Sequence, residues 1–273
     1  MHPVIYDFGA ITISSFGVMM VIAFLLGNYL LRKDVVAEGY EPIVAEDITF
    51  RAAIGGILGA KIYYLIETIP TGQAADNISG LIEIIAGIFT LSGGRIADGI
   101  QNFGAGLVFL GGLMGGMAAV SWYVYRNKLN WLKVADWVAP VLILGHGIGR
   151  IGCFLVGDDY GIPSNLPWAC AFPQGLPPTD ITVHPTQLYE MTAYFTIFFY
   201  LRYTKRNQHF IGELMFKYLL LGGFARFMIE ILRTNTKYFF GLSGAQYISI
   251  IMMLIGVYQI MKRRHLNASQ NII

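Results

Sequence analysis

Long, mostly apolar runs recur along this chain of 273 residues, and they constrain its fold more than any other feature. A run of about 18 residues crosses roughly 30 Å of hydrocarbon when it is helical. Because a segment in lipid must satisfy its own backbone polar groups, such runs predict transmembrane α-helices. The composition agrees, since 55% of the residues are hydrophobic and 13% are charged, which is about half the charged share of a soluble domain.

The apolar windows predict an all-α integral membrane protein of about seven transmembrane helices. A shorter apolar segment, 80–92, contains Glu83 and is interpreted as re-entrant or interfacial rather than as an eighth span. The first run has no Lys or Arg before it and continues into Arg32, so we expect a retained helix and not a cleaved signal. The expected spans lie near 14–31, 48–68, 103–125, 132–156, 187–203, 211–232 and 245–261.

Basic residues gather in alternate loops of this arrangement, whereas the loop 157–184 has no Lys or Arg. The positive-inside rule therefore predicts an N-terminus outside the cytoplasm and a C-terminus inside. We expect one membrane-embedded domain over 1–273, with extracytoplasmic insertions at about 69–102 and 157–186. The net charge of +2 gives no indication of a nucleic-acid partner. The basic residues in question are Arg32, Lys33, Arg126, Lys128, Arg202, Lys205, Arg206, Lys262, Arg263 and Arg264.

Charged groups at membrane depth are costly, so each one needs a partner or a function. The first such cluster, HGIGRIGCFLVGDDYG, begins at His146 at the outer end of the fourth expected span. His146 and Arg150 are four residues apart and share a helical face. Asp158 and Asp159 follow within reach of a turn. The planar guanidinium of Arg150 is suited to bind a phosphate group through paired hydrogen bonds.

Two further clusters lie near the same membrane boundary. HPTQLYE, from His184 to Glu190, brings a histidine, an amide, a phenol and a carboxylate to the start of the fifth expected span. Late in the sixth, Arg226, Glu230 and Arg233 are spaced by four and three residues and share one face. A glycine-rich stripe at 106–116 indicates only that a helix or a lipid chain packs closely.

A purely structural interpretation of these residues is also open. Arg226 and Glu230 would then neutralise each other inside the bundle, as buried charges in membrane helices do. Tyr189 would anchor its helix at the interface, and Gln187 would form a hydrogen bond between helices. Arginines on two helices beside a His–Gln–Tyr–Glu cluster weaken this interpretation and favour a functional site.

The sequences HGIGRIGCFLVGDDYG, HPTQLYE and GFARFMIEILR, in this order and spacing, resemble those of bacterial prolipoprotein diacylglyceryl transferases. The resemblance includes SSFGVMM, GAKIYY and FLGGLMGG in the first three expected spans and covers about residues 14–262. HPTQLYE and the GRxG…G pattern are specific to the family, whereas glycine pairs are not.

The resemblance implies a transferase of the bacterial cytoplasmic (inner) membrane with its site toward the extracytoplasmic side. Its implied partners are phosphatidylglycerol, the lipobox segment of a prolipoprotein and membrane lipids. The diacylglyceryl group would move to the lipobox cysteine thiol, and glycerol phosphate would leave. Arg150 and Arg226 would stabilise the charge on the phosphate. Substrate-binding roles are implied for Arg150, Gly161, Gln187, Tyr189, Glu230 and Arg233. We also expect a substrate-binding role for Cys153, although it departs from the family pattern.

This sequence departs from the family pattern at four positions. The family usually has Tyr at Phe16, His at Leu110, Asn at Cys153 and Glu at Asp158. The missing histidine is a candidate thiol base, and the missing asparagine is a polar contact near the phosphate. These departures indicate a divergent member of the family.

His146 is the first candidate for the missing base, because an unperturbed histidine pKa of about 6.5 suits a base at neutral pH. His184 and Asp158 are the next candidates. The alternative for His146 is a structural hydrogen bond inside the bundle.

The two cysteines, Cys153 and Cys170, are both expected toward the oxidising face of the membrane. Three interpretations stay open: a disulfide that fixes the loop, a reactive Cys153 thiol that attacks the lipid, or two inert thiols.

Two other functions are compatible with the sequence. A paralogue would pass the lipid group to a different acceptor nucleophile, and a protein without chemistry would bind or translocate anionic lipids. Headgroup passage does not require the histidine, amide and carboxylate groups beside the arginines. No cofactor and no metal are expected, because the histidines are not spaced as a ligand set.

Overall fold

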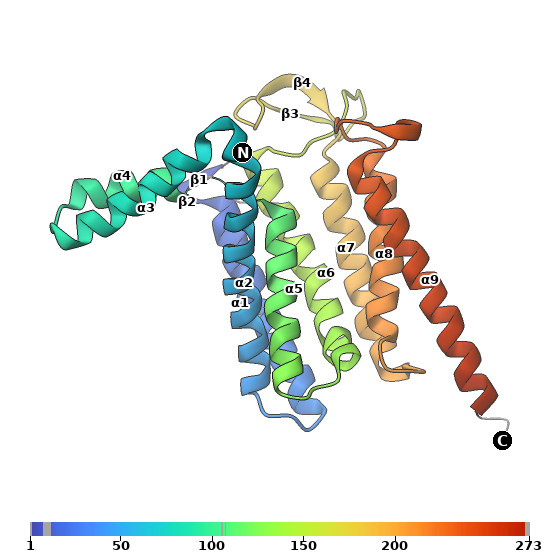
Figure 1. Ribbon diagram of the computed structural model, residues 1–273. Helices are drawn as coiled ribbons and strands as arrows, with labels where there is room; N and C mark the ends of the chain where they lie inside the picture. The colour runs from blue at the N-terminus through green and yellow to red at the C-terminus, as the bar shows by residue number, and fades with distance from the viewer. Residues whose placement is uncertain (1, 8–11, 105, 107, 271–273) are drawn as a thin grey trace. The chain divides into compact units, whose positions relative to one another are not determined.

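The computed structural model describes residues 2–7, 12–104, 106 and 108–270, and these are mostly helical (Figure 1). By its internal contacts the chain divides into two compact units. One unit comprises Met1–Pro42 and Asn130–Ile273, and the other comprises Ile43–Leu129.

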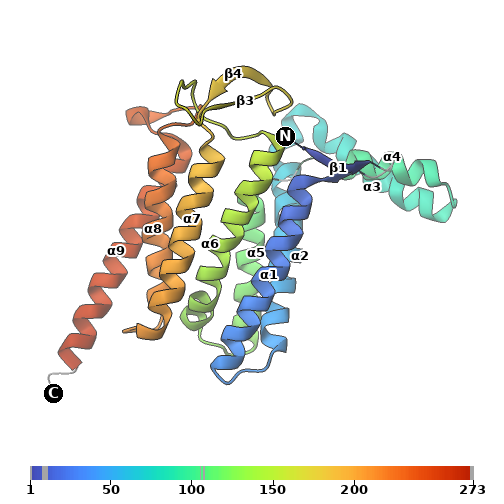
Figure 2. The same cartoon turned by 180° about the vertical axis from the view of Figure 1, so that it is seen from behind.

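The first unit is a helix bundle with two small antiparallel sheets. Helix α6 packs against α1, α7 and α8, and α8 also packs against α7 and α9. Figures 1 and 2 show the β3–β4 hairpin over the ends of α6 and α7. The elements are β1 (Val4–Asp7), β2 (Thr12–Ser14), α1 (Ser15–Ala37), α6 (Trp131–Val156), β3 (Cys170–Phe172), β4 (Thr179–Val183), α7 (Thr186–Thr204), η2 (Lys205–Asn207), α8 (Glu213–Glu230), η3 (Phe239–Gly241) and α9 (Gly244–Gln270).

Helix α6 has clear signals at both of its ends. The Asn130 side chain accepts a hydrogen bond from the backbone N–H of Lys133 at 3.2 Å, which is a typical N-cap. At the other end Gly157 has a φ of 79°, a left-handed conformation that suits a residue without Cβ. The chain therefore leaves the helix at Gly157 and carries Asp158 and Asp159 into the loop above the bundle.

The core of the first unit is formed by large apolar side chains of α6, α7 and α8. Ile143, Leu201 and Leu214 are at most 1% exposed, and Tyr194 and Tyr218 are also buried among them. Because the alternative to burial within a membrane is lipid and not water, these side chains stabilise the bundle through close van der Waals packing. This packing fixes the three helices whose ends carry the polar clusters.

The second unit consists of a helix pair and a helical hairpin. Its elements are α2 (Ile43–Thr68), η1 (Ile69–Thr71), α3 (Gln73–Phe89), α4 (Gly93–Gly104) and α5 (Phe109–Arg126). Helices α2 and α5 pack through glycines, since a Cβ on Gly59 would collide with the Gly111 carbonyl and one on Gly115 with the Gly55 carbonyl. The glycine stripe therefore packs against another helix, which is one of the two partners predicted for it.

Four of the described helical segments are long and apolar enough to cross a membrane: Ser15–Ala37, Ile43–Thr71, Trp131–Val156 and Gly244–Leu266. The other three expected spans are also helical, as α5, α7 and α8. The predicted start of the third span was wrong, because α5 begins at Phe109 rather than near residue 103. Residues 93–104 form the separate helix α4, and residues 105 and 107 lie outside the described part of the chain.

Candidate functional site

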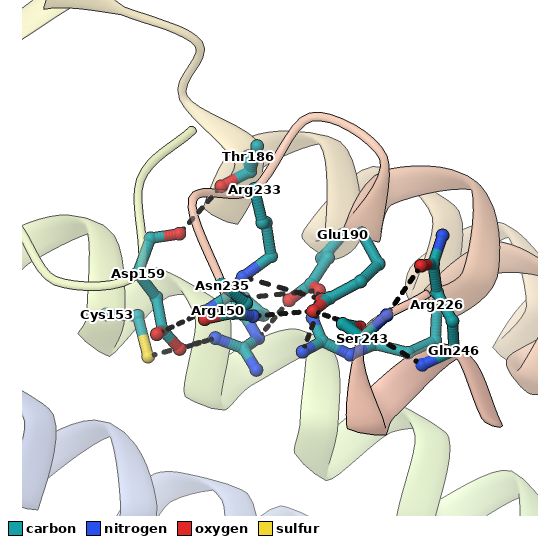
Figure 3. A network of polar contacts seen from close by, with 11 residues as sticks. Arg150, Cys153, Asp159, Thr186, Glu190, Arg226, Arg233, Asn235, Ser243 and Gln246 are labelled. Carbon is teal, nitrogen blue, oxygen red and sulfur yellow. Dashed lines mark hydrogen bonds and ion pairs between the residues drawn. The ribbon is translucent and has the colours of Figure 1, made fainter. Parts of the chain in front are cut away.

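Three arginines and three carboxylates meet where α6, α7 and α8 end beneath the loop (Figure 3). Helix α6 contributes Arg150, α7 contributes Glu190, and α8 contributes Arg226 and Glu230. Asp159 follows α6, and Arg233 follows α8. The structure thus brings together residues that the sequence placed in three separate clusters.

Glu190 lies at the centre of this arginine–carboxylate network. Its side chain has no exposed surface, and its two oxygens form ion pairs with Nε of Arg150 and Nη1 of Arg226. Nη1 of Arg233 lies 3.8 Å from the same carboxylate. Because Glu190 is buried among three cations, it holds guanidinium groups from two helices at fixed positions.

Glu230 is the second buried carboxylate of the network. It pairs with Nη2 of Arg226 at 2.8 Å. The side chains of Asn235 and Ser243 donate hydrogen bonds to its other oxygen at 2.6 and 2.8 Å. These contacts fix the segment after α8 and the start of α9 around Arg226, where Gln246 also contacts Ser243.

Asp159 is the third carboxylate and the most exposed of the three. It pairs with Nη1 of Arg150 at 2.7 Å and with Nη2 of Arg233, and its backbone carbonyl accepts a hydrogen bond from Thr186. Burial acts to raise the pKa of Asp159, but the Arg233 and Arg150 charges outweigh burial and hold this pKa below its usual value. Asp159 is therefore the carboxylate that links the loop to the arginines.

The arginines differ in how much of their side chain is exposed. Arg150 and Arg226 are 21% and 23% exposed, whereas Arg233 is 5% exposed. Each of the first two pairs with two carboxylates and still reaches the surface of the site. Arg150 and Arg226 are therefore the groups able to contact an anionic ligand, and Arg233 is the inner support.

Asp158 faces Cys153 rather than the arginines. The ligand atoms of Cys153, Asp158 and Asp159 lie within 4.8 Å of one another, and burial raises the pKa of the Asp158 carboxyl. The Asp158 carbonyl accepts a hydrogen bond from the buried Gln187 amide. A metal at these three groups would compete with Arg150 and Arg233 for Asp159, so we expect no metal there.

The two cysteines are free thiols in this structure. Cys153 is 8% exposed, and Nη1 of Arg150 lies 3.5 Å from its sulfur. Cys170 opens strand β3 in the loop and is half-buried. The disulfide considered from the sequence is therefore not formed, and the choice between a reactive and an inert Cys153 stays a prediction.

A second polar group contains His184, Tyr189 and Trp168. Nδ1 of His184 lies 3.2 Å from the Tyr189 hydroxyl, which also accepts a hydrogen bond from the Trp168 indole at 2.7 Å. Tyr189 thus connects the start of α7 to the loop. This contact is compatible with the structural role, as an anchor of its helix, that the sequence left open. The catalytic role of His184 remains a prediction.

His146 lies one turn before Arg150 on α6, deeper in the bundle. Its ring centroid is 5.9 Å from that of Tyr194 and 6.4 Å from that of Tyr218. The ring therefore lies beside one tyrosine of α7 and one of α8, and its role as a base remains a prediction.

Gly161 is held by its backbone, between the loop and the residues after α8. Its N–H donates to the His184 carbonyl at 2.9 Å, and it pairs with Arg233 as an isolated antiparallel bridge. A Cβ at this position would lie 2.6 Å from the Leu232 carbonyl oxygen. Glycine is therefore required at this close approach between the loop and the segment that carries Arg233.

None of the four departures from the family pattern is one of the arginines or carboxylates of this network, although Cys153 and Asp158 lie beside it. Phe16 on α1 packs against Gly152 of α6, because a Cβ on Gly152 would lie 3.0 Å from the Phe16 ring. Leu110 is on α5, in the second unit, and is 39% exposed.

The sequence did not identify Glu190 and Asp159 as site residues, although it contained both within its clusters. It also gave no indication of Asn235, Ser243 and Gln246. The sequence could have identified Glu190, because it is a carboxylate at membrane depth with no cationic residue within one turn of its own helix. Such a carboxylate implies a cationic partner on another helix.

The chain is similar in sequence to known proteins over nearly its whole length. Residues 3–262 match the family model described as prolipoprotein diacylglyceryl transferase. A phosphatidylglycerol–prolipoprotein diacylglyceryl transferase of Clostridium tetani is 32% identical over 94% of this chain and 96% of its own length. The enzymes of that name from Leptospira interrogans and Aliivibrio fischeri are 31% and 29% identical over 91% and 93% of this chain, and 88% and 85% of their own lengths. The chain belongs to the prolipoprotein diacylglyceryl transferase family.

Proposed function

We propose that this protein transfers the diacylglyceryl group of phosphatidylglycerol to the lipobox cysteine of prolipoproteins. The observation that carries the proposal is the pair Arg150 and Arg226, both partly exposed and both held by the fully buried Glu190. The similar proteins align with this chain over most of their length, and their names describe the same reaction.

The reaction is a displacement at a glyceryl carbon. The lipobox thiolate supplies the electron pair for the new C–S bond. The C–O bond to the phosphate breaks, and glycerol phosphate leaves with the electron pair of that broken C–O bond. Charge therefore develops on the departing phosphate oxygen. Arg150 and Arg226 are positioned to stabilise this charge, and their fixed ion pairs reduce the reorganisation needed during the step.

The thiol must lose its proton, because the thiolate is the nucleophile. His146 is our first candidate for the base, with His184 and Asp158 next. If His146→Gln in folded, membrane-inserted protein leaves turnover unchanged, His146 is not the base.

The remaining site residues position the substrates in this proposal. Gln187 and Glu230 are buried and fix the loop and Arg226, while Gly161 and Arg233 connect the loop to the residues after α8. Cys153 lies beside Arg150, and Tyr189 lies in the first turn of α7; we assign both to substrate contacts.

We also propose the finer topology expected from the sequence. Helices α1, α2, α5, α6, α7, α8 and α9 would span the bacterial inner membrane, with the N-terminus outside and the C-terminus inside. The loop 157–186 and the arginine–carboxylate network would then face the extracytoplasmic side. Exported prolipoproteins and outer-leaflet phosphatidylglycerol meet on that side.

A depletion and rescue experiment tests the proposal. Cells depleted of their own transferase accumulate unmodified prolipoprotein, and the protein is expected to restore the diacylglyceryl adduct. Arg150→Ala should abolish rescue, whereas Arg263→Ala, late in α9, should retain it. A properly inserted parent protein that fails to rescue would favour a different acceptor or a lipid-binding role.

A further inference from the structure

The segment 237–243 between α8 and α9 folds into a tight turn, which we call the α8–α9 hairpin. The residues at its two ends pair as an isolated antiparallel bridge, and the Tyr238 N–H donates to the Leu242 carbonyl at 2.8 Å. The Leu242 N–H donates in turn to the Phe239 carbonyl at 3.2 Å. These hydrogen bonds close the turn around η3 and leave its middle residues at the tip.

Three consecutive aromatic residues form this tip. Tyr238, Phe239 and Phe240 are 63%, 85% and 96% exposed. Phe240 has a φ of 54°, in the left-handed region that is unfavourable for a residue with a Cβ. Gly241 follows with a φ of 69°, and two positive φ angles in succession are typical of hairpin turns that prefer Asn-Gly. Because the turn itself does not favour phenylalanine, the exposed ring indicates contact with a surface outside the chain.

Both neighbouring helices fix the base of the α8–α9 hairpin. Asn235 and Ser243, on either side of the turn, donate hydrogen bonds to Glu230 at the end of α8 (Figure 3). The Tyr247 hydroxyl of α9 donates to the Phe239 carbonyl. Figures 1 and 2 show the segment projecting sideways from the ends of α8 and α9. The aromatic tip is therefore directed away from the core of the bundle.

The hairpin ends where a membrane-spanning helix begins. The candidate span Gly244–Leu266 starts directly after Ser243 and has 23 residues. At 1.5 Å per residue these cover about 34 Å, which matches the hydrocarbon thickness of roughly 30 Å. The α8–α9 hairpin therefore lies at the boundary between hydrocarbon and water.

The helices that lead to the hairpin have exposed apolar faces. Phe224, Met228 and Ile231 follow one face of α8 at intervals of four and three residues and are 42–52% exposed. Extended apolar surface of this kind is typical of a membrane contact. The corresponding residues of α9, 44–56% exposed, are Ile248, Ile251 and Ile255.

We propose that the aromatic tip of the α8–α9 hairpin inserts into the interfacial layer of the membrane. Phe239 and Phe240 contact the lipid chains just below the headgroups, and the Tyr238 phenol lies at headgroup depth. Lys237 is exposed beside Tyr238, where its long side chain reaches lipid phosphates. We assign lipid rather than a protein partner to the tip, because the hairpin leads directly into a span with exposed apolar side chains. The placement does not depend on the transfer reaction, so a failure of the proposed activity leaves it unaffected.

Fluorophores at single positions in the full-length protein test this placement. Cys153→Ser and Cys170→Ser remove the native thiols, and the polarity-sensitive label NBD is attached at Tyr238→Cys or Phe240→Cys. Asp180→Cys is the control, because it is exposed on β4, over the ends of α6 and α7. The protein is placed at one copy per nanodisc, and quenching by nitroxide-labelled lipid is compared with quenching by iodide in water.

We expect the ratio of lipid quenching to iodide quenching at Tyr238 and Phe240 to exceed that at Asp180 by at least about threefold. A variant with Phe239→Ser and Phe240→Asn shows whether the rings or the label cause insertion, since Asn-Gly suits the turn. In that variant the ratio at Tyr238 should fall to near the control value.

Three results would overturn the proposal. The first is an equal quenching ratio at all three labelled positions. The second is lipid quenching at Tyr238 that persists after Phe239→Ser and Phe240→Asn. The third is protection from iodide that requires two copies per disc, which would indicate that the tip contacts another copy of the chain instead of lipid.

Discussion

Arg150 on α6 forms an ion pair with Glu190 on α7, a carboxylate that has no exposed surface. The same carboxylate binds Arg226 of α8, so three helices depend on one acidic side chain. Removal of one partner from a buried ion pair typically costs about 3–5 kcal/mol, because the other charge is left uncompensated.

Glu190→Gln should therefore lose activity and stability together. We expect transfer to fall by roughly 100-fold or more, the scale of losing a preorganised charge contact, and the unfolding temperature in detergent to fall. Glu38→Gln, which alters the ion pair with Lys133 elsewhere in the first unit, is the matched control and should keep its activity. Full activity in Glu190→Gln would show that Glu190 is not needed to position Arg150 and Arg226.

Lysine at the two exposed arginine positions tests phosphate binding. Arg150→Lys and Arg226→Lys keep the charge but lose the planar pair of donors. We expect a higher KM for phosphatidylglycerol and a turnover lower by about 10²–10³-fold, because the charge on the leaving group is less well stabilised. Arg263→Lys serves as the control, and unchanged kinetics in both site variants would exclude direct phosphate contacts.

The two adjacent aspartates should have opposite effects on stability. The pKa of Asp159 is lowered in the folded state, so its contribution is present above the unfolded pKa of about 4 and is lost as the pH falls through the folded pKa. Asp159→Asn should therefore lower the unfolding temperature at pH 7, and the loss should shrink toward pH 3.

Burial raises the pKa of Asp158, so its contribution to stability is present below the unfolded pKa and is lost as the pH rises through the folded pKa. Asp158→Asn should leave the unfolding temperature at pH 7 equal or higher. Thermal unfolding of both variants between pH 3 and pH 7 checks the signs, and parallel curves for the two would show the assignment to be wrong.

Packing around Gly161 gives a prediction with a control in the same part of the chain. Gly161→Ala places a methyl group 2.6 Å from the Leu232 carbonyl oxygen and should cost about 1–3 kcal/mol. Gly149→Ala on α6 meets open space and should be neutral or stabilising. Comparison of unfolding temperatures and activity decides whether this close approach positions Arg233.

The free thiols can be tested by alkylation without reduction. Under denaturing conditions both Cys153 and Cys170 should be modified, as mass mapping would show. In the folded protein Cys170 should react first because Cys153 is more buried, although burial raises the pKa of Cys170 and slows its reaction at neutral pH. Protection of both cysteines after denaturation would instead show a disulfide.

Much of the fold followed from the sequence, because the length and apolarity of each run determine whether it forms a helix in lipid. The spacing of Arg226 and Glu230 likewise showed that they share a face, and the structure pairs them at 2.8 Å. The start of α5 was not predictable, since the apolar window does not show that residues 93–104 form a helix of their own.

The sequence did not predict which carboxylates pair with the arginines. Helical periodicity relates residues on one helix but does not say which helices meet, so Glu190 was not assigned to Arg150. Asp158 was chosen over Asp159 from the family pattern. The left-handed turn at Gly157 instead presents Asp159 to Arg150 and leaves Asp158 against Cys153.

Transfer by the purified protein would show whether the arginine–carboxylate network catalyses diacylglyceryl transfer. The protein in detergent is mixed with phosphatidylglycerol and a synthetic lipobox peptide, and the peptide mass is followed over time. We predict a diacylglyceryl adduct on the cysteine, equimolar release of glycerol phosphate, and neither product with Arg150→Ala. An unmodified peptide with the folded parent protein, or an adduct formed equally well by Arg150→Ala, would exclude catalysis by this network.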